Sequence, residues 1–195
     1  MASKQLVSQT MMVIFLFMMM NYVSPSRFVI KDAALIDTVC QKTSDPNFCK
    51  STLNSDSRSA SADLNGLADI VLQQAEVKAL EILARIQRLT KEATDPRIQN
   101  GLFACNQLYG PARDKISAAI LDLTRDATRA ASLASGAALD PVTCEASFRP
   151  SPSPLTNENN VFASLAKTAS EIINEMVNKK KNHHSHILST CNQLR

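Results

Sequence analysis

The sequence lacks tryptophan, strand-like alternation and any histidine in its main body. Its three histidines, His183, His184 and His186, all lie close to the C-terminus. No histidine is therefore placed to activate a serine or cysteine nucleophile, and no glycine-rich phosphate loop is present. Paired carboxylates can act as acid and base without histidine, but the sequence predicts no pocket for them. We expect an all-α protein that is not an enzyme and needs no cofactor.

The N-terminus has the composition of a secretory signal. Residues 11–20, MMVIFLFMMM, are wholly apolar, and six of the seven methionines fall within residues 1–20. About ten apolar residues suit a signal h-region, whereas a membrane span needs about 20. We predict a signal peptide over residues 1–26, cleaved after Ser26; the alternative is a retained membrane anchor. No later stretch approaches membrane-spanning length, so no stable membrane association is expected after cleavage.

The remaining 169 residues fit one domain and show little charge imbalance. Their basic residues are interspersed with acidic ones, and no basic groove rich in aromatics is present, so no nucleic-acid partner is expected. Few glycines and many alanines suit closely packed helices. No N-x-[ST] sequon occurs, so N-glycosylation is not expected.

Helical periodicity is clearest between residues 98 and 123. Apolar residues there alternate steps of four and three, which is typical of a bundle helix with one buried stripe. The stripe comprises Ile98, Leu102, Cys105, Tyr109, Ala112, Ile116, Ala119 and Leu123. One of its members is a cysteine, so this helix can be tied covalently to a neighbour.

Three further helices are predicted around this one. The first is capped by Ser61 or Asp63 and continues to Leu89; the third begins near Asp126 and carries Ala130, Ala134, Ala137, Cys144 and Phe148. The fourth follows the stiff RPSPSP connector, is capped by Thr156 and buries Phe162, Leu165, Ala169, Ile172 and Met176. We interpret residues 57–178 as an antiparallel four-helix bundle, preceded by a helical hairpin over residues 27–56.

The five cysteines follow a secretion signal, so disulfides are expected rather than metal or redox sites. Cys40 and Cys49 bracket the turn of the hairpin and are predicted to pair. Cys105 and Cys144 lie on the inner stripes of consecutive helices, which an antiparallel arrangement can bring together. Cys191 is left over, either unpaired or available for an intermolecular bridge. It lies in a polar, basic, histidine-rich tail over residues 179–195, which we expect to be disordered and to bind metal at most incidentally.

Two prolines fall inside predicted helices. Pro111 removes a backbone hydrogen bond and costs roughly 3 kcal/mol or forces a kink, so a bend is expected near residues 107–111. Pro141 falls just before Cys144 and raises the same expectation there. Each irregularity is either merely tolerated or re-aims the surface toward a particular partner.

Four segments, in this order, resemble the plant invertase and pectin methylesterase inhibitor family. They are LIDTVCQKTSDPNFCKSTL, SDSRSASADLNGLA, KEATDPRIQNGLFACNQLY, and ALDPVTCEASF followed by PLTNENN. The resemblance covers about residues 35–178 and implies a four-helix bundle preceded by a hairpin. It also implies one disulfide inside the hairpin and one joining the second and third bundle helices.

The resemblance implies a secreted inhibitor of a carbohydrate-active enzyme. In the pectin methylesterase branch the bundle lies across the enzyme's substrate cleft; in the invertase branch a segment with Pro-Lys-Phe enters the active site. The corresponding region here reads TRDATRAAS (124–132), without Pro-Lys-Phe. We therefore favour pectin methylesterase as the partner, with acid invertase as the alternative. A third reading is a helical scaffold that does not inhibit.

The expected docking face lies on the outward sides of the second and third helices. It comprises Gln107, Arg113, Asp114, Asp122, Arg125 and Arg129; the alternative is that these residues form an ordinary solvated surface. The expected location is the apoplast or cell wall. A vacuolar location is possible if the tail is a sorting extension, and it would favour the invertase reading.

Overall fold

The computed structural model describes residues 34–193, so the predicted signal peptide and its cleavage site lie outside the described residues. Helix occupies residues 34–40, followed by α3 (Pro46–Asn54), the 3-10 helix η1 (Ser57–Ser61), α4 (Leu64–Glu92), α5 (Pro96–Asp122), α6 (Ala127–Ala137), α7 (Asp140–Ala146) and α8 (Thr156–Gln193). The described part of the chain contains no strand. The all-α prediction is confirmed.

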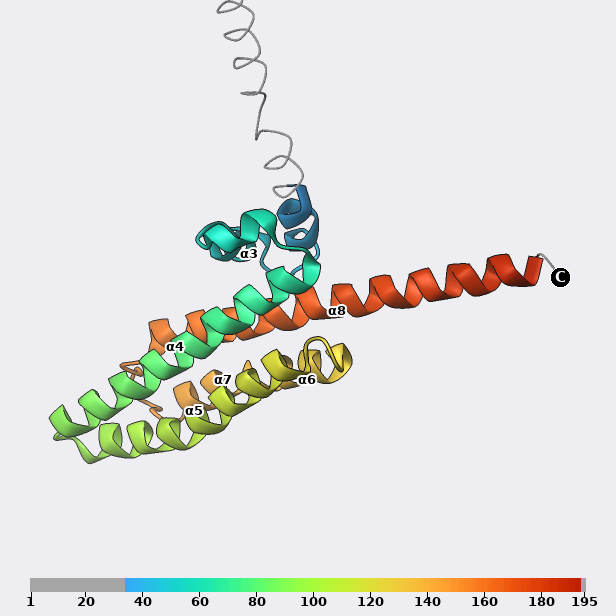
Figure 1. Cartoon of the computed structure of the whole chain (residues 1–195). Coiled ribbons are helices and arrows are strands. Elements are labelled where there is room, and N and C mark those ends of the chain that lie inside the picture. The colour runs from blue at the N-terminus through green and yellow to red at the C-terminus, as the bar shows by residue number, and fades with distance from the viewer. Residues whose placement is uncertain (1–33, 194–195) are drawn as a thin grey trace, which may run out of the picture.

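A small hairpin at the N-terminal end packs against one end of the bundle (Figure 1). The disulfide Cys40–Cys49 closes it, with the two Cα atoms 5.5 Å apart. Asp45 caps α3 by accepting a hydrogen bond from the Phe48 N–H at 3.0 Å. Lys42 holds the hairpin to α8 through an ion pair with Glu175, Nζ to Oε1 2.5 Å.

Helices α4 and α5 form an antiparallel pair joined by a three-residue link (Figure 1). Asp63 caps α4 and Asp95 caps α5, each by accepting a backbone N–H with its carboxylate. The stripe predicted on α5 is buried from Leu102 to Leu123, with Ile98 partly buried against the same core. The helices therefore pack through the faces that the periodicity predicts.

Helix α5 continues through Gly110 and Pro111 without interruption. Pro111 has no N–H, so the carbonyl of Gln107 lacks its usual helical donor. A residue before proline normally avoids the α region because its Cβ crowds the proline ring. Gly110 has no Cβ, which suits it to this position. The bend near residues 107–111 stays a prediction.

The third predicted helix is in fact two helices, and this part of the prediction is wrong. Helix α6 ends at Ala137 and α7 begins at Asp140, with Pro141 in its first turn. Proline fits the start of a helix, where its missing N–H has no partner to lose. Cys144 therefore lies on the short helix α7, and the disulfide Cys105–Cys144 joins α5 to α7 rather than to the main third helix.

Helix α8 is longer than expected. The predicted disordered tail is wrong as far as Gln193, because α8 continues to that residue and projects beyond the other helices (Figure 1). No glycine or proline occurs after Pro154, so nothing in the sequence stops the helix. Thr156 is its first residue and not its cap, and the Thr156 hydroxyl donates to Glu145 Oε1 at 2.5 Å.

Gly101 allows α5 to approach the segment after α7 closely. A Cβ at this position would lie 2.5 Å from Phe148 Cε1, and Phe148 is itself buried. Replacing Gly101 with alanine should therefore lower the free energy of unfolding by about 1–2 kcal/mol, because overpacking outweighs the gain in helix propensity. Urea denaturation followed by circular dichroism measures this change.

Gly136→Ala is the matched control for this substitution. Its nearest neighbour would be Lys115 Cδ at 4.0 Å, an ordinary contact. The control should raise stability by about 0.5–1 kcal/mol through helix propensity alone. If both variants shift stability in the same direction, packing against Phe148 does not explain the glycine.

Candidate functional site

The six side chains of the predicted docking face fall into two groups and one isolated residue. Arg113 and Asp114 form an ion pair on α5, with Nη2 and Oδ1 2.5 Å apart. At the turn between α5 and α6, Arg129 lies 3.3 Å from Asp122, and Arg125 donates to the Leu121 carbonyl at 3.0 Å. Gln107 is exposed on α5, away from both groups.

These six residues do not share one face. Arg113 faces α4: Asp114 raises the pKa of its guanidinium, and the charge of Glu76 on α4 adds to the effect. Asp122 faces the other side of α5 and binds a residue of α6. Only Gln107 and Asp114 lie on the outward side of α5, seven residues apart and so on one line along the helix.

Two exposed apolar residues extend that line. The side chains of Phe103 and Leu121 are 66% and 64% exposed, although both lie within a helix that packs in the bundle. With Gln107 and Asp114 they repeat at steps of four and seven, so the four residues form one row. We name Phe103, Gln107, Asp114 and Leu121 the α5 row. Phe103 was not among the predicted docking residues, and the only signal for it in the sequence is an aromatic residue one position off the buried stripe.

Phe103 also borders a shallow groove between α4 and α5. The groove has a volume of about 360 Å³ and is lined by Ile86, Gln87, Thr90, Lys91, Leu102, Phe103 and Asn106. Its lining combines apolar and amide side chains with a single charge. Such a surface can receive an apolar or aromatic side chain from a partner, but it offers no acid–base pair for chemistry.

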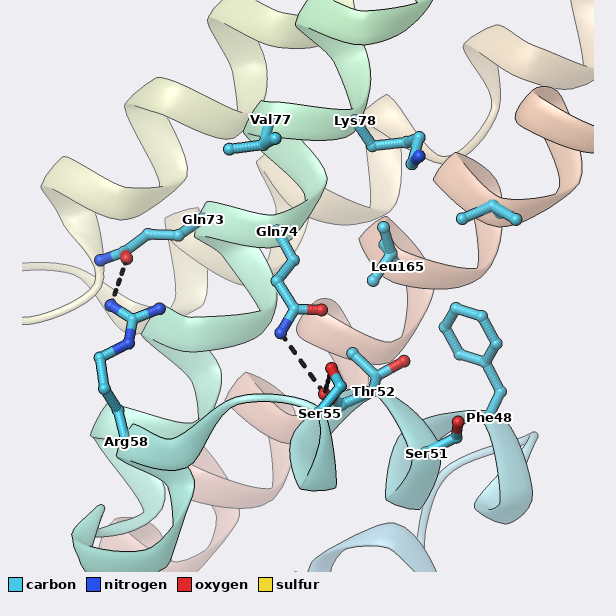
Figure 2. Close-up of a pocket in the computed structure, with 11 residues that line it drawn as sticks. Phe48, Ser51, Thr52, Ser55, Arg58, Gln73, Gln74, Val77, Lys78 and Leu165 are labelled. Atoms are coloured by element: carbon cyan, nitrogen blue, oxygen red, sulfur yellow. Dashed lines mark hydrogen bonds between the residues drawn. The ribbon is translucent and has the colours of Figure 1, made fainter.

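A larger hollow of about 440 Å³ lies between α3, α4 and α8 (Figure 2). Arg58 and Lys78 border it. Arg58 forms an ion pair with Asp56, and Lys78 forms one with Glu81. Arg58 lowers the pKa of Asp56 to about 2 through hydrogen bonds. The hollow holds no nucleophile beside a base, so its residues are not arranged for catalysis.

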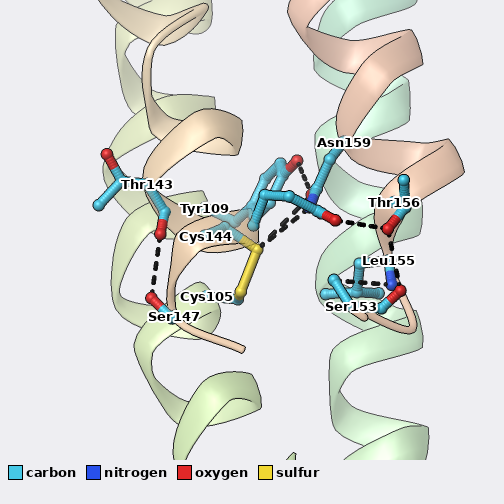
Figure 3. Close-up of a disulfide and its surroundings, with 10 residues drawn as sticks. Cys105, Tyr109, Thr143, Cys144, Ser147, Ser153, Leu155, Thr156 and Asn159 are labelled. Atoms are coloured by element: carbon cyan, nitrogen blue, oxygen red, sulfur yellow. Dashed lines mark hydrogen bonds between the residues drawn. A yellow bond between two sulfur atoms is a disulfide. The ribbon is translucent and has the colours of Figure 1, made fainter. Parts of the chain in front are cut away.

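A buried polar network surrounds the second disulfide (Figure 3). The Tyr109 hydroxyl donates to Asn159 Oδ1 at 2.8 Å, and Asn159 Nδ2 donates to Glu145 Oε2 at 2.7 Å. Burial, with smaller contributions from nearby carboxylates, raises the pKa of Tyr109 above its usual range. Tyr109 therefore stays a neutral donor. The network joins α5, α7 and α8 and has a structural role.

Among the side chains that the structure describes, no group of three or more His, Cys, Asp or Glu is placed to hold a metal ion. The described helices also include none that combines the length and the apolar composition needed to cross a membrane. His183, His184, His186 and Cys191 have side chains outside the described set.

The model of the plant invertase/pectin methylesterase inhibitor family matches residues 34–172. This match covers more than half of the chain and both disulfides. The chain belongs to this family.

Two relatives show the two branches of the family. A pectinesterase inhibitor from Actinidia deliciosa is 36% identical over 119 residues, which cover 60% of this chain and 64% of that protein. The cell wall/vacuolar inhibitor of fructosidase 1 from Arabidopsis thaliana is 35% identical over 81 residues, 42% of this chain and 38% of that protein. The matched parts therefore span less than two thirds of the length of either relative.

A solved structure supports the fold. The crystal structure of a mutant form of a pectin methylesterase inhibitor from Arabidopsis aligns with a TM-score of 0.64 at 27% identity, covering 71% of this chain and 95% of that one. The relatives and structural neighbours are inhibitor proteins, not enzymes. This inhibitor-family chain is therefore not an enzyme, as the sequence analysis expected.

Proposed function

We propose that this protein inhibits a pectin methylesterase by docking one-to-one, with the α5 row laid across the enzyme's substrate cleft. The observation that carries this proposal is the exposed row Phe103, Gln107, Asp114 and Leu121 on a helix fixed by a disulfide and by buried packing. A rigid surface loses little conformational entropy on docking. Interfaces of inhibitors of this kind bury on the order of 1,600 Å² in total.

The turn between α5 and α6 supports the choice of a methylesterase. It occupies residues 123–126, in the region where the invertase branch carries Pro-Lys-Phe. Here Arg129 pairs with Asp122 and Arg125 donates to the Leu121 carbonyl, so both side chains contact the protein itself. A short turn without an aromatic side chain is poorly suited to entering an active site.

Acid invertase is the second candidate target. The similarity to inhibitors of fructosidase and invertase favours it, because the match to a putative invertase inhibitor from Platanus orientalis covers 71% of this chain and the match to the pectinesterase inhibitor covers 60%. Both targets agree with a protein of the cell wall or vacuole. We propose the cell wall as the location, which a fluorescently tagged chain followed by microscopy tests directly.

The proposal is tested by adding the purified protein, with both disulfides formed, to a pectin methylesterase and to an acid invertase separately over a pH series. We expect the methylesterase to be inhibited at a one-to-one ratio and the invertase to keep its activity. Inhibition of the invertase alone would transfer the proposal to the second target. Inhibition of neither enzyme would contradict both and favour a scaffold without inhibitory activity.

A further inference from the structure

The net positive charge of the chain comes entirely from its last twenty residues. Residues 176–195 contain Lys179, Lys180, Lys181 and Arg195 and no aspartate or glutamate. Residues 1–175 contain 17 basic and 18 acidic side chains, so they have a slight negative charge. The molecule therefore has a weakly acidic body and a basic end.

Helix α8 carries the three lysines out of the bundle (Figure 1). Met176 is the last buried side chain of α8 among those described, and residues 178–182 are all exposed. Within the described part of the chain, Lys179 alone of the three has an acidic neighbour, Glu175 at 3.9 Å, and Glu175 lies closer to Lys42. The positive charge of Lys179–Lys181 is thus largely left for an external partner.

We propose that the basic end, Lys179–Lys181 on the projecting part of α8, binds a polyanionic polysaccharide with carboxylates along its chain. A lysine amine is a compact charge on a flexible stem, which suits repeated carboxylates in no fixed geometry. Successive helix positions point about 100° apart, so the three amines reach out on different sides of α8. Binding to a dense polyanion releases its counterions, so the contact weakens as salt rises.

The choice of a polyuronate rests on the proposed function. Removing methyl esters from a pectic polymer leaves one carboxylate for each ester cleaved, so the substrate becomes polyanionic where a methylesterase has acted. A basic end would hold the inhibitor there. An anionic membrane surface fits less well, because residues 178–186, NKKKNHHSH, contain no apolar side chain and a membrane-surface helix needs an apolar face.

The test measures binding of the purified protein to polygalacturonate and to its fully methyl-esterified form, at low and at raised salt. We expect binding to the free acid only, with release as salt rises. The variant with Lys179, Lys180 and Lys181 all changed to glutamine should bind at least about fivefold more weakly, since each exposed pair contributes a modest amount. The control changes Arg88, Arg97 and Lys167, all exposed on the bundle or its ends, to glutamine. It removes the same charge and should bind like the unmodified protein.

Three results would overturn the proposal. They are equal binding by the tail variant, equal binding to the esterified polymer, or tighter binding to vesicles of anionic phospholipid than to polygalacturonate. Enzyme inhibition in solution reports separately on the proposed function. The tail variant should inhibit a methylesterase on a soluble substrate as well as the unmodified protein does, so either proposal can fail while the other stands.

Discussion

Replacing Cys105 and Cys144 together with alanine is expected to lower the free energy of unfolding by about 4 kcal/mol. The two cysteines are 39 residues apart, and a cross-link closing a loop of that size restricts the unfolded chain by about this amount in the chain-entropy model. Alanine avoids placing a new hydroxyl at two positions that are fully buried. Urea denaturation followed by circular dichroism at 222 nm measures the change.

The position of α7 makes this disulfide more than a constraint on the unfolded state. Helix α7 has seven residues, too few to be stable by itself. Four links hold it: the disulfide to α5, the Lys115–Asp140 ion pair at 2.8 Å, and the hydrogen bonds that Glu145 accepts from Thr156 and Asn159. Losing the covalent link should therefore loosen α7 first. The hydrogen-exchange rates of the α7 amides should rise before those of the α4 amides.

The other disulfide provides the control. Changing Cys40 and Cys49 to alanine removes a cross-link between residues nine apart. It should lower the free energy of unfolding by roughly 2.5–3 kcal/mol, and the loss of structure should be confined to the hairpin. Equal losses at both sites, or faster exchange in α7 in the hairpin variant, would contradict this account of how α7 is held.

Helix existence and burial could be predicted from the sequence because both follow from local periodicity. Along α5 every residue assigned to the inner stripe is buried or partly buried. Asp63 was one of the two predicted caps of α4 and is the residue that caps it, since a side-chain cap is a local interaction. These features need no knowledge of the partner helices.

The errors come from interactions that a local pattern does not contain. Alanines keep a helical spacing as far as Ala137, and Pro141 signals an irregularity without showing whether it bends one helix or begins another. The break forms because α7 turns to place Cys144 against Cys105 and Phe148 against Gly101. The end of α8 was predicted wrongly although its signal is local. The polar composition of the tail suggested disorder, whereas the absence of glycine and proline allows α8 to continue.

The candidate site was predictable only in part. Gln107 and Asp114 were found as outward residues, but the sequence could not show that Arg113 and Asp122 turn toward neighbouring helices, because that depends on where α4 and α6 lie. The Tyr109–Asn159 hydrogen bond joins residues 50 apart and has no signal in either segment. Exposure of Phe103 likewise depends on how the bundle closes.

Phe103→Ala is expected to weaken inhibition of the target enzyme at least about thirtyfold. An aromatic residue that anchors an interface commonly costs 2 kcal/mol or more of binding free energy when truncated, which corresponds to that factor. The Phe103 side chain is two-thirds exposed, so its loss should leave the thermal unfolding midpoint within about 1 °C of the original. An inhibition constant measured beside a melting curve separates lost contact from lost structure.

Leu139→Ala is the matched control, because Leu139 is exposed to the same extent as Phe103 but lies between α6 and α7, off the α5 row. It should change inhibition less than about twofold. Leu121→Ala, at the other end of the row, should have an intermediate effect, since leucine is a less frequent interface hot spot than the larger aromatic side chains. If Leu139→Ala weakens inhibition and Phe103→Ala does not, docking occurs through the α6–α7 side and the α5 row is an ordinary solvated surface. The three variants together therefore locate the docking face whichever enzyme proves to be the target.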